Sequence, residues 1–218
     1  VGCELVWMSP LEMQLCLEDR GMKILVAGAS PQRTLFYDLA NMVSPGEVAT
    51  EKAHSDLDFP PSLFFHWVKY NSSGEGCPYN CSIDYGAITS DIHTFLLTAS
   101  PSPSDLLVVQ AGIHDMYFGS LAAYRANLPT LSRYLRSLID ANTVRVLFRV
   151  GDMVHLPRGG DWSLVEHGFR SHRVALAMEL ARLEMERAGV PVLDTLQLTA
   201  PRPEATGDGY HYNQWQDA

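Results

Sequence analysis

Five short apolar segments recur along the chain, and they constrain its fold more than any other feature. Each is rich in β-branched or aromatic residues and is bounded by Gly, Pro or Asp, which is the pattern of a buried parallel strand. These segments are residues 23–27, 63–69, 106–111, 144–150 and 190–194. Helical patterns fall between several of them, over residues 31–43, 124–139 and 169–188. Strands that alternate with helices predict an α/β fold, a three-layer α/β/α sandwich around a parallel, doubly wound sheet of about five strands.

The length and composition fit one domain of this class. A chain of 218 residues can bury a substantial core, and 46% hydrophobic with 19% charged residues is typical of a folded globular protein. No repeat and no long internal linker divides the sequence, so we expect a single domain over residues 1–218. The sequence does not begin with Met and shows no signal peptide, which favours a processed or excerpted domain.

The charge balance argues against two classes of partner. A formal net charge of −9 offers no cationic surface that would neutralise phosphates, so neither a nucleic acid nor an anionic membrane is an expected partner. No apolar run approaches the roughly 20 residues that a membrane helix needs. Any membrane anchor would therefore lie outside this chain.

Four cysteines lie outside the expected core strands: Cys3, Cys16, Cys77 and Cys81. Their even number is typical of two disulfides in an oxidising compartment. Of the three possible pairings, we favour Cys3 with Cys16 and Cys77 with Cys81. A zinc site is the weaker interpretation, because the last two cysteines have C-x-x-x-C spacing in a Pro/Asn-rich loop without a convincing second ligand pair. We therefore expect no metal.

Two N-glycosylation sequons agree with that compartment. They begin at Asn71 and Asn80, within a stretch of Ser, Gly, Pro, Asn and Cys over residues 71–86 that is typical of a surface loop. Together with the cysteines they favour the lumen of the secretory pathway, such as the Golgi, or the extracellular space.

A serine and a histidine at opposite ends of the chain are candidates for catalysis. Ser30 follows the first apolar segment and precedes a helical pattern with Pro31 in its first turn. Such a serine either caps the helix or acts as a nucleophile, which then needs a base. His211 follows Asp208 by three residues, a spacing that lets a carboxylate orient an imidazole. The alternative for His211 is an ordinary surface histidine.

A third polar segment, residues 110–115, ends the third expected strand. Loops at the carboxyl ends of parallel strands commonly carry oxyanion donors, and here Gly112 offers a backbone N–H while His114 offers a side-chain donor. The alternative is a strand-terminating turn in which Asp115 caps the next element. Residues 151–166 come after the fourth strand and are expected to form a wall of the same crevice.

Taken together, these blocks resemble the SGNH/GDSL hydrolase superfamily and, more narrowly, its PC-esterase branch, which includes sialic acid and plant polysaccharide O-acetyltransferases. The first family block, G-D-S-x-x-R, corresponds to residues 28–33; the middle block, G-x-N-D, to residues 112–115; and the last block, D-x-x-H, to residues 208–211. The resemblance implies a flavodoxin-like SGNH sheet.

The resemblance also implies roles for individual residues. Ser30 would be the nucleophile, His211 its general base and Asp208 the orienting carboxylate. The oxyanion hole would be formed by the N–H of Ser30, a glycine after the second strand for which Gly86 is the candidate, and the middle block with Gly112 and His114. Arg33 would hold substrate or acyl donor, the alternative being a solvated charge in the first helical turn.

The implied reaction is transfer or hydrolysis of an acetyl ester on a carbohydrate hydroxyl through an acetyl-serine intermediate. No bound cofactor is implied; a transferase would take an acetyl donor such as acetyl-CoA as co-substrate, and the partner is a carbohydrate or glycan. Two residues depart from the family pattern, since Ala29 replaces an acidic residue and His114 replaces an asparagine. The alternative is therefore a weakened or inactive module that binds glycans or has a structural role. An unrelated nucleotide-binding fold is disfavoured, because no G-x-G-x-x-G spacing is present.

Overall fold

The computed structural model describes residues 9–43, 57–59, 62–68, 83–155, 171–202 and 206. Its centre is one sheet of six strands in the order β2-β3-β1-β4-β5-β6. The strands are β1 (Ile24–Gly28), β2 (Leu57–Phe59), β3 (Leu63–Trp67), β4 (Leu106–Val109), β5 (Arg145–Val150) and β6 (Val192–Asp194). Five strands run parallel, and β2 pairs antiparallel with β3 at one edge.

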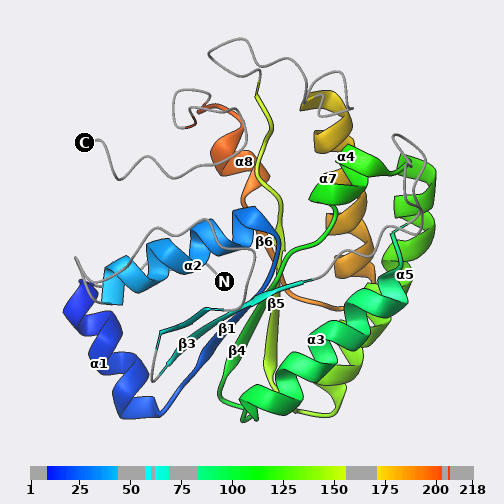
Figure 1. Cartoon of the computed structure of the whole chain (residues 1–218). Helices are drawn as coiled ribbons and strands as arrows, with labels where there is room; N and C mark the ends of the chain where they lie inside the picture. The colour runs from blue at the N-terminus through cyan, green and yellow to red at the C-terminus, as the bar shows by residue number, and fades with distance from the viewer. Residues whose placement is uncertain are drawn as a thin grey trace.

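Helices cover both faces of this sheet, so the molecule has three layers (Figure 1). The helices are α1 (Pro10–Arg20), α2 (Ser30–Val43), α3 (Tyr85–Ala99), α4 (Ile113–Phe118), α5 (Leu121–Asp140), α7 (Ser171–Arg187) and α8 (Leu196–Thr199). On one face α2 packs on β1 and β3, and α1 packs on α2; on the other face α3, α5 and α7 lie side by side. The predicted α/β sandwich with five parallel strands is confirmed.

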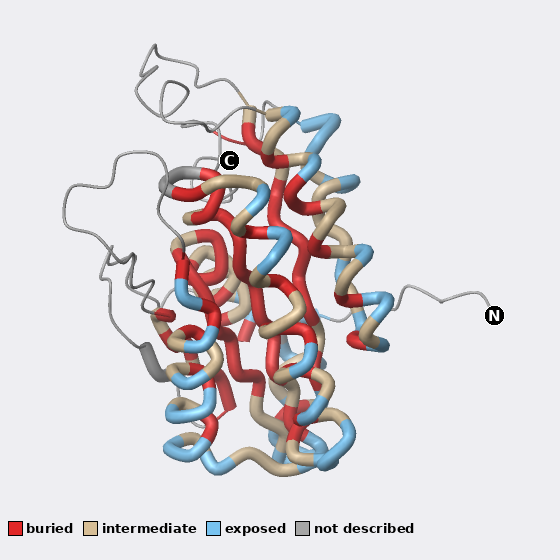
Figure 2. Tube along the Cα trace, turned by 90° about the vertical axis from the view of Figure 1, so that its right-hand side faces the viewer, coloured by how far each residue is buried: buried red, intermediate tan, exposed pale blue. Residues whose placement is uncertain are grey.

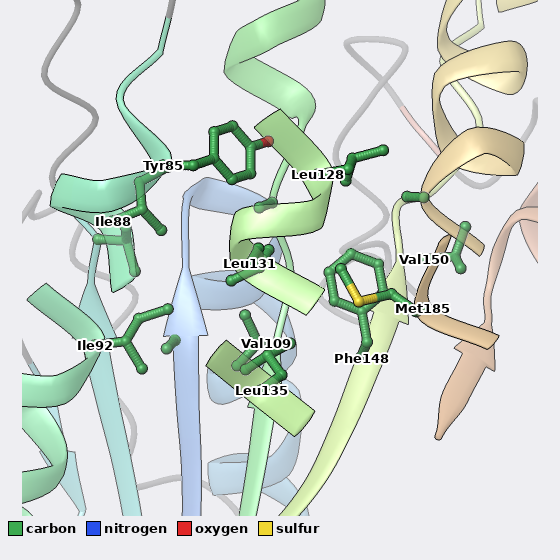
Figure 3. Packing of buried hydrophobic residues seen from close by; sticks show 14 of the residues in the cluster. Tyr85, Ile88, Ile92, Val109, Leu128, Leu131, Leu135, Phe148, Val150 and Met185 are labelled. Atoms are coloured by element: carbon green, nitrogen blue, oxygen red, sulfur yellow. The ribbon is translucent and has the colours of Figure 1, made fainter. Parts of the chain in front are cut away.

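The faces of the sheet bury two apolar clusters, and the strands between the helical layers are almost wholly buried (Figure 2). The larger cluster packs the α3–α5–α7 face, where Phe148 of β5 and Leu135 of α5 are fully buried (Figure 3). The smaller cluster joins Phe36 of α2 to Phe65 of β3. Strand β1 contributes to both, since all five of its residues are buried. A central strand buried on both faces needs apolar side chains on both, which is why it reads as a continuous apolar run.

Several elements differ from the prediction. The sequence patterns did not reveal the edge strand β2 or the helices α1, α3, α4 and α8. Helix α3 begins at Tyr85, so the stretch predicted as a loop over residues 71–86 ends in a helical turn that Asp84 caps through the N–H groups of Gly86 and Ala87. Residues 71–82 of that stretch lie outside the described residues.

The predicted disulfides and sequons lie largely outside the described part of the chain. Cys16 is half-buried on α1 and carries a free thiol in the structure, whereas Cys3, Cys77, Cys81, Asn71 and Asn80 lie outside the described residues. The two pairings therefore stay predictions. No helix within the described ranges is long and apolar enough to cross a membrane.

Candidate active site

The candidate site lies where the parallel strands β1 and β4 end. In their register Ala27 is paired with Val109, so Ser30 and Gly112 each come three residues after this last pair. Because parallel strands present their carboxyl ends at one edge of the sheet, the two segments lie beside each other there. The fold thus brings together the first and the middle of the three sequence blocks.

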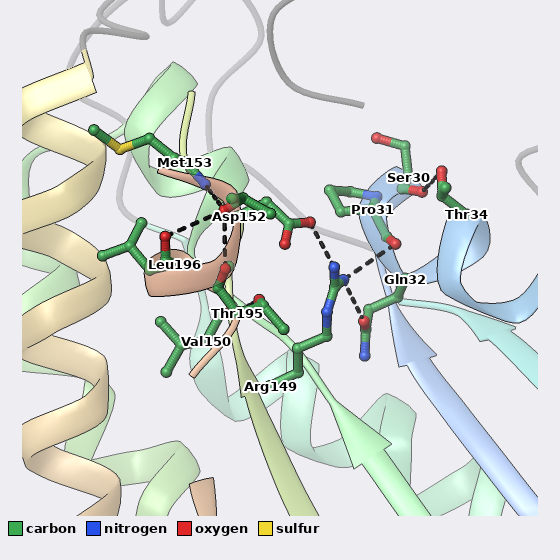
Figure 4. Close-up of polar contacts among 12 residues, drawn as sticks. Ser30, Pro31, Gln32, Thr34, Arg149, Val150, Asp152, Met153, Thr195 and Leu196 are labelled. Carbon is green, nitrogen blue, oxygen red and sulfur yellow. Dashed lines mark hydrogen bonds and ion pairs between the residues drawn. The ribbon is translucent and has the colours of Figure 1, made fainter. Parts of the chain in front are cut away.

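Ser30 is the first residue of α2, and only Ala29 separates it from the end of β1. The turn is closed by the N–H groups of Gln32 and Arg33, which donate to the carbonyl oxygen of Ala29 at 2.9 and 3.1 Å. The side-chain hydroxyl of Ser30 points away from the sheet in Figure 4. A serine so placed is held by backbone geometry and presents its oxygen beyond the strand ends.

Gly28 is required by the way Gln32 folds back over the turn. The φ of Gly28 is +157°, and a Cβ there would lie 2.5 Å from Cγ of Gln32. Glycine is the residue that allows this close approach. The fully buried Gln32 side chain then donates from Nε2 to the carbonyl oxygen of Val108 in β4, at 3.4 Å.

A buried arginine from β5 contacts the same turn. Arg149 Nη1 donates to the carbonyl oxygen of Pro31 at 3.2 Å and to Oε1 of Gln32 at 3.0 Å (Figure 4). Its Nη2 pairs with Oδ2 of Asp152 at 2.5 Å. The start of α2 is therefore tied to the end of β5.

Burial raises the pKa of Asp38, on α2, to about 6, although the nearby positive charge of Arg149 opposes this shift.

Ala29 lies in an apolar environment. It is 1% exposed and belongs to the larger hydrophobic cluster. The family pattern places an acidic side chain at this position, and the alanine adds only apolar surface to the core. The side chains that fix the Ser30 turn in this protein therefore belong to other residues.

The middle block begins a short helix. Gly112 is the N-cap of α4 with φ +112°, and a Cβ on it would lie 2.5 Å from the Tyr124 hydroxyl oxygen. Only glycine fits this backbone conformation against that ring. His114 lies in the first turn of α4 and is half-buried.

The alternative interpretation of this block, in which Asp115 caps the next element, is wrong, because the N-cap of α4 is Gly112. Asp115 is buried inside α4, and the Tyr85 hydroxyl donates to its Oδ2 at 3.0 Å. Burial raises the pKa of Asp115 to about 7, and the hydrogen bond from Tyr85 opposes that rise. The carboxyl group thus anchors the middle block to the start of α3.

The structure does not support an oxyanion role for Gly86. Its N–H donates at 2.8 Å to Oδ1 of Asp84 as part of the α3 cap. The donor is already used by the helix that it begins, so Gly86 is not a member of the proposed oxyanion hole. The sequence pattern placed Gly86 in a loop and gave no sign of this cap.

Arg33 is buried and does not extend into solvent. It is 9% exposed, and its guanidinium lies over the Trp67 ring, 5.5 Å from the ring centroid. The arrangement is a cation–π contact between α2 and the end of β3. The alternative of a solvated first-turn charge is therefore wrong.

The last block lies outside the described residues, which include neither Asp208 nor His211. The chain leading to it is placed at the carboxyl edge: Nε2 of His155 lies 3.1 Å from the carbonyl oxygen of Thr199, and the N–H of Met153 donates to the Thr199 hydroxyl. Thr206, two residues before Asp208, is buried. Helix α8 lies beyond the strand ends in Figure 1.

Metal ligands are not gathered in the described part of the chain, where no group of three or more His, Cys, Asp or Glu side chains could hold an ion. The polar groups around the Ser30 turn include its hydroxyl, backbone N–H groups, the His114 ring and several buried polar side chains.

Comparison with known proteins places this geometry in a known fold. An acetyl xylan esterase superposes with a TM-score of 0.51 at 14% identity, covering 88% of this chain and 92% of the esterase. A protein proposed to be an acylhydrolase from Bacteroides fragilis superposes with a TM-score of 0.55 at 12% identity, covering 97% and 91%. A protein proposed to be an SGNH hydrolase from Slackia heliotrinireducens gives 0.51 at 16% identity, covering 88% and 90%. The chain has the SGNH hydrolase fold. No family model and no curated protein sequence matches it.

Three buried polar residues near the Ser30 turn were not predicted from the sequence: Gln32, Arg149 and Asp152. Gln32 occupies a variable position of the first block. Arg149 stands in the buried half of β5, between Phe148 and Val150. A charge inside a buried strand was the one signal that could have marked it, because such a residue needs a partner.

Proposed function

We propose that this protein is a carbohydrate O-acetyltransferase or acetylesterase that works through an acetyl-Ser30 intermediate. One observation carries the proposal: Ser30 opens α2 at the carboxyl end of the central strand, beside the Gly112 segment that ends β4. This is where an SGNH-type nucleophile and its oxyanion donors would meet. The structures with the same fold include an acetyl xylan esterase, which supports an acetyl ester as the substrate.

The reaction proceeds in two steps. Ser30 Oγ attacks the acetyl carbonyl carbon while His211, oriented by Asp208, accepts the serine proton. The oxyanion accepts hydrogen bonds from the N–H groups of Ser30 and Gly112 and from the His114 ring. When the tetrahedral intermediate collapses, the bond to the leaving group breaks, and His211 returns the proton to it.

Transfer and hydrolysis differ in the second step. A sugar hydroxyl attacks acetyl-Ser30 in a transferase, with an acetyl donor such as acetyl-CoA supplying the acyl group, and water attacks in an esterase. In both cases His211 removes the proton of the attacking hydroxyl, and Ser30 is restored. Arg33, held over Trp67, is proposed to contact the substrate or acyl donor at the edge of the site.

The experiment is intact-mass spectrometry after exposure to 4-nitrophenyl acetate. Wild type should gain one acetyl group on Ser30, and Ser30→Ala should gain none. Ser9→Ala is the matched control, because Ser9 also stands at a helix start but caps α1. Acetylation of wild type and Ser30→Ala to the same extent would refute the nucleophile.

A second candidate is favoured by Ala29, which leaves the nucleophile turn without its acidic side chain. The protein would then be a glycan-binding or structural module with the same fold. Folded wild type that forms no adduct at Ser30 and releases 4-nitrophenol no faster than Ser30→Ala would support this candidate, and binding to immobilised glycans would then be measured.

The location is proposed from the sequence. We place the protein in the secretory lumen or outside the cell, with glycans at Asn71 and Asn80 and disulfides joining Cys3–Cys16 and Cys77–Cys81. Expression through a secretory pathway should give a mass loss on treatment with a peptide-N-glycosidase and no free thiol under denaturing conditions. A free Cys16 thiol in the secreted protein would refute the first pairing.

A further inference from the structure

A bridge of two buried side chains spans three neighbouring strands beside Ser30. Gln32, on the turn after β1, donates to the carbonyl oxygen of Val108 in β4 and accepts from Arg149 of β5. Arg149 also donates to the carbonyl oxygen of Pro31, the residue directly after Ser30. Since β4 lies between β1 and β5 in the sheet, the bridge fixes the turn against both strands.

The bridge is built from buried side chains. Gln32 is 0% exposed and Arg149 is 8% exposed. A buried guanidinium costs stability unless it is paired, and Asp152 supplies the pairing charge at 2.5 Å. The carboxyl group of Asp38 on α2 also interacts electrostatically with Arg149 and Asp152. A planar guanidinium held by several acceptors has one orientation, so its contacts with Pro31 and Gln32 are fixed in direction.

The bridge controls a spacing that the proposed chemistry needs. Ser30 comes after β1 and Gly112 after β4, and acyl transfer requires the nucleophile and the oxyanion donors to keep their relative positions within a fraction of an ångström. Ala29 contributes no hydrogen bond from its side chain to this turn. The Gln32–Arg149 bridge is the connection from the turn to both β4 and β5.

We propose that Arg149 is a positioning residue, which acts through Gln32 and Pro31 to hold Ser30 in register with the Gly112 segment. This inference rests on the proposed function of Ser30. Arg149 itself touches no reacting atom.

The test compares Arg149→Met with Arg145→Met. Arg145 lies at the opposite end of the same strand, is exposed, and donates to the carbonyl oxygen of Ser104. The first readout is the rate of Ser30 acetylation by 4-nitrophenyl acetate at saturating ester. We expect Arg149→Met to slow it about 100-fold with little change in half-saturating concentration, and Arg145→Met to leave it unchanged. Arg149→Lys should recover only part of the rate, because a lysine lacks the planar fork.

The second readout is amide hydrogen exchange, which does not depend on activity. In Arg149→Met the N–H groups of Gln32 and Arg33 should exchange at least tenfold faster, while those of β4 stay as in wild type. If Arg149→Met does not fold, Gln32→Met provides a second variant. It breaks the bridge but keeps the Arg149–Asp152 pair. It should give the same local pattern.

The outcomes separate this inference from the proposed function. Equal acetylation rates in Arg149→Met, Gln32→Met and Arg145→Met would overturn the positioning role, as would faster exchange spread evenly over the whole sheet. If wild type forms no acetyl-Ser30 and releases 4-nitrophenol no faster than Ser30→Ala, the proposed function fails, and exchange confined to the Ser30 turn would still establish the bridge.

Discussion

Replacing the buried Asp115 with Asn should remove much of the pH dependence of folding stability. Burial raises the pKa of this carboxyl group in the folded protein from 3.8 to about 7. The folded state therefore binds the proton more tightly than the unfolded state. Its contribution to stability is fully present below pH 3.8 and is lost as the pH rises through about 7. The full shift corresponds to about 4 kcal/mol, at about 1.36 kcal/mol per pKa unit.

Only part of this difference falls in a convenient pH range. For one carboxyl group with these two pKa values, raising the pH from about 5 to about 8 lowers the free energy of unfolding of wild type by about 2.5 kcal/mol relative to that of Asp115→Asn. The asparagine keeps an oxygen that accepts the Tyr85 hydrogen bond, so the packing is conserved. Urea unfolding followed by circular dichroism at both pH values measures the two free energies of unfolding.

The control is Asp19→Asn, which removes an exposed carboxylate on α1. Its pH curve should run parallel to that of wild type. Tyr85→Phe should raise the pKa of Asp115 further, because it removes the hydrogen bond that lowers it. A constant difference between wild type and Asp115→Asn across this pH range would refute the reasoning.

Three further substitutions test the packing and the turns. Phe148→Ala removes a fully buried ring at the centre of the larger cluster and should cost about 3–5 kcal/mol in urea unfolding; a cost below about 1 kcal/mol would contradict the packing. Gly112→Ala should lower the melting temperature more than Gly21→Ala, since both have positive φ but only Gly112 faces an obstructing ring; equal shifts would show that Tyr124 moves aside freely. Ser9→Ala breaks the capping box with Glu12 and should cost about 1 kcal/mol, and an unchanged unfolding midpoint would exclude a stabilising cap.

The sequence was a sufficient guide to the sheet because buried parallel strands have a strong local signal. The segments predicted at residues 23–27, 106–111 and 144–150 match β1, β4 and β5 within two residues at each end. The predicted end of the helix before Gly189 is also confirmed: α7 ends at Arg187 and Gly189 has φ +70°. Such signals need only neighbouring residues, since glycine alone adopts this conformation without strain.

The elements that were not predicted have weaker local signals. Helix α3 comes after a long polar stretch, and its start depends on the cap formed by Asp84. The three-residue strand β2 is too short for an alternating pattern, and it forms because β3 offers a free edge for antiparallel pairing. The strand therefore depends on the sheet beside it, and its own residues carry no pattern that predicts it.

The sequence by itself determined the order of strands and helices, the position of Ser30 at a strand-to-helix turn, and the glycines that its turn and the Gly112 turn require. These depend on residues that are close in the chain, so local sterics and hydrophobic periodicity fix them. Only the tertiary structure decided what holds the Ser30 turn. Arg149 lies 118 residues beyond Pro31 in the chain and contacts it because only β4 separates β5 from β1. Asp115, whose burial raises its pKa, lies on a helix that packs against α5 and α7 and accepts a hydrogen bond from Tyr85 of α3.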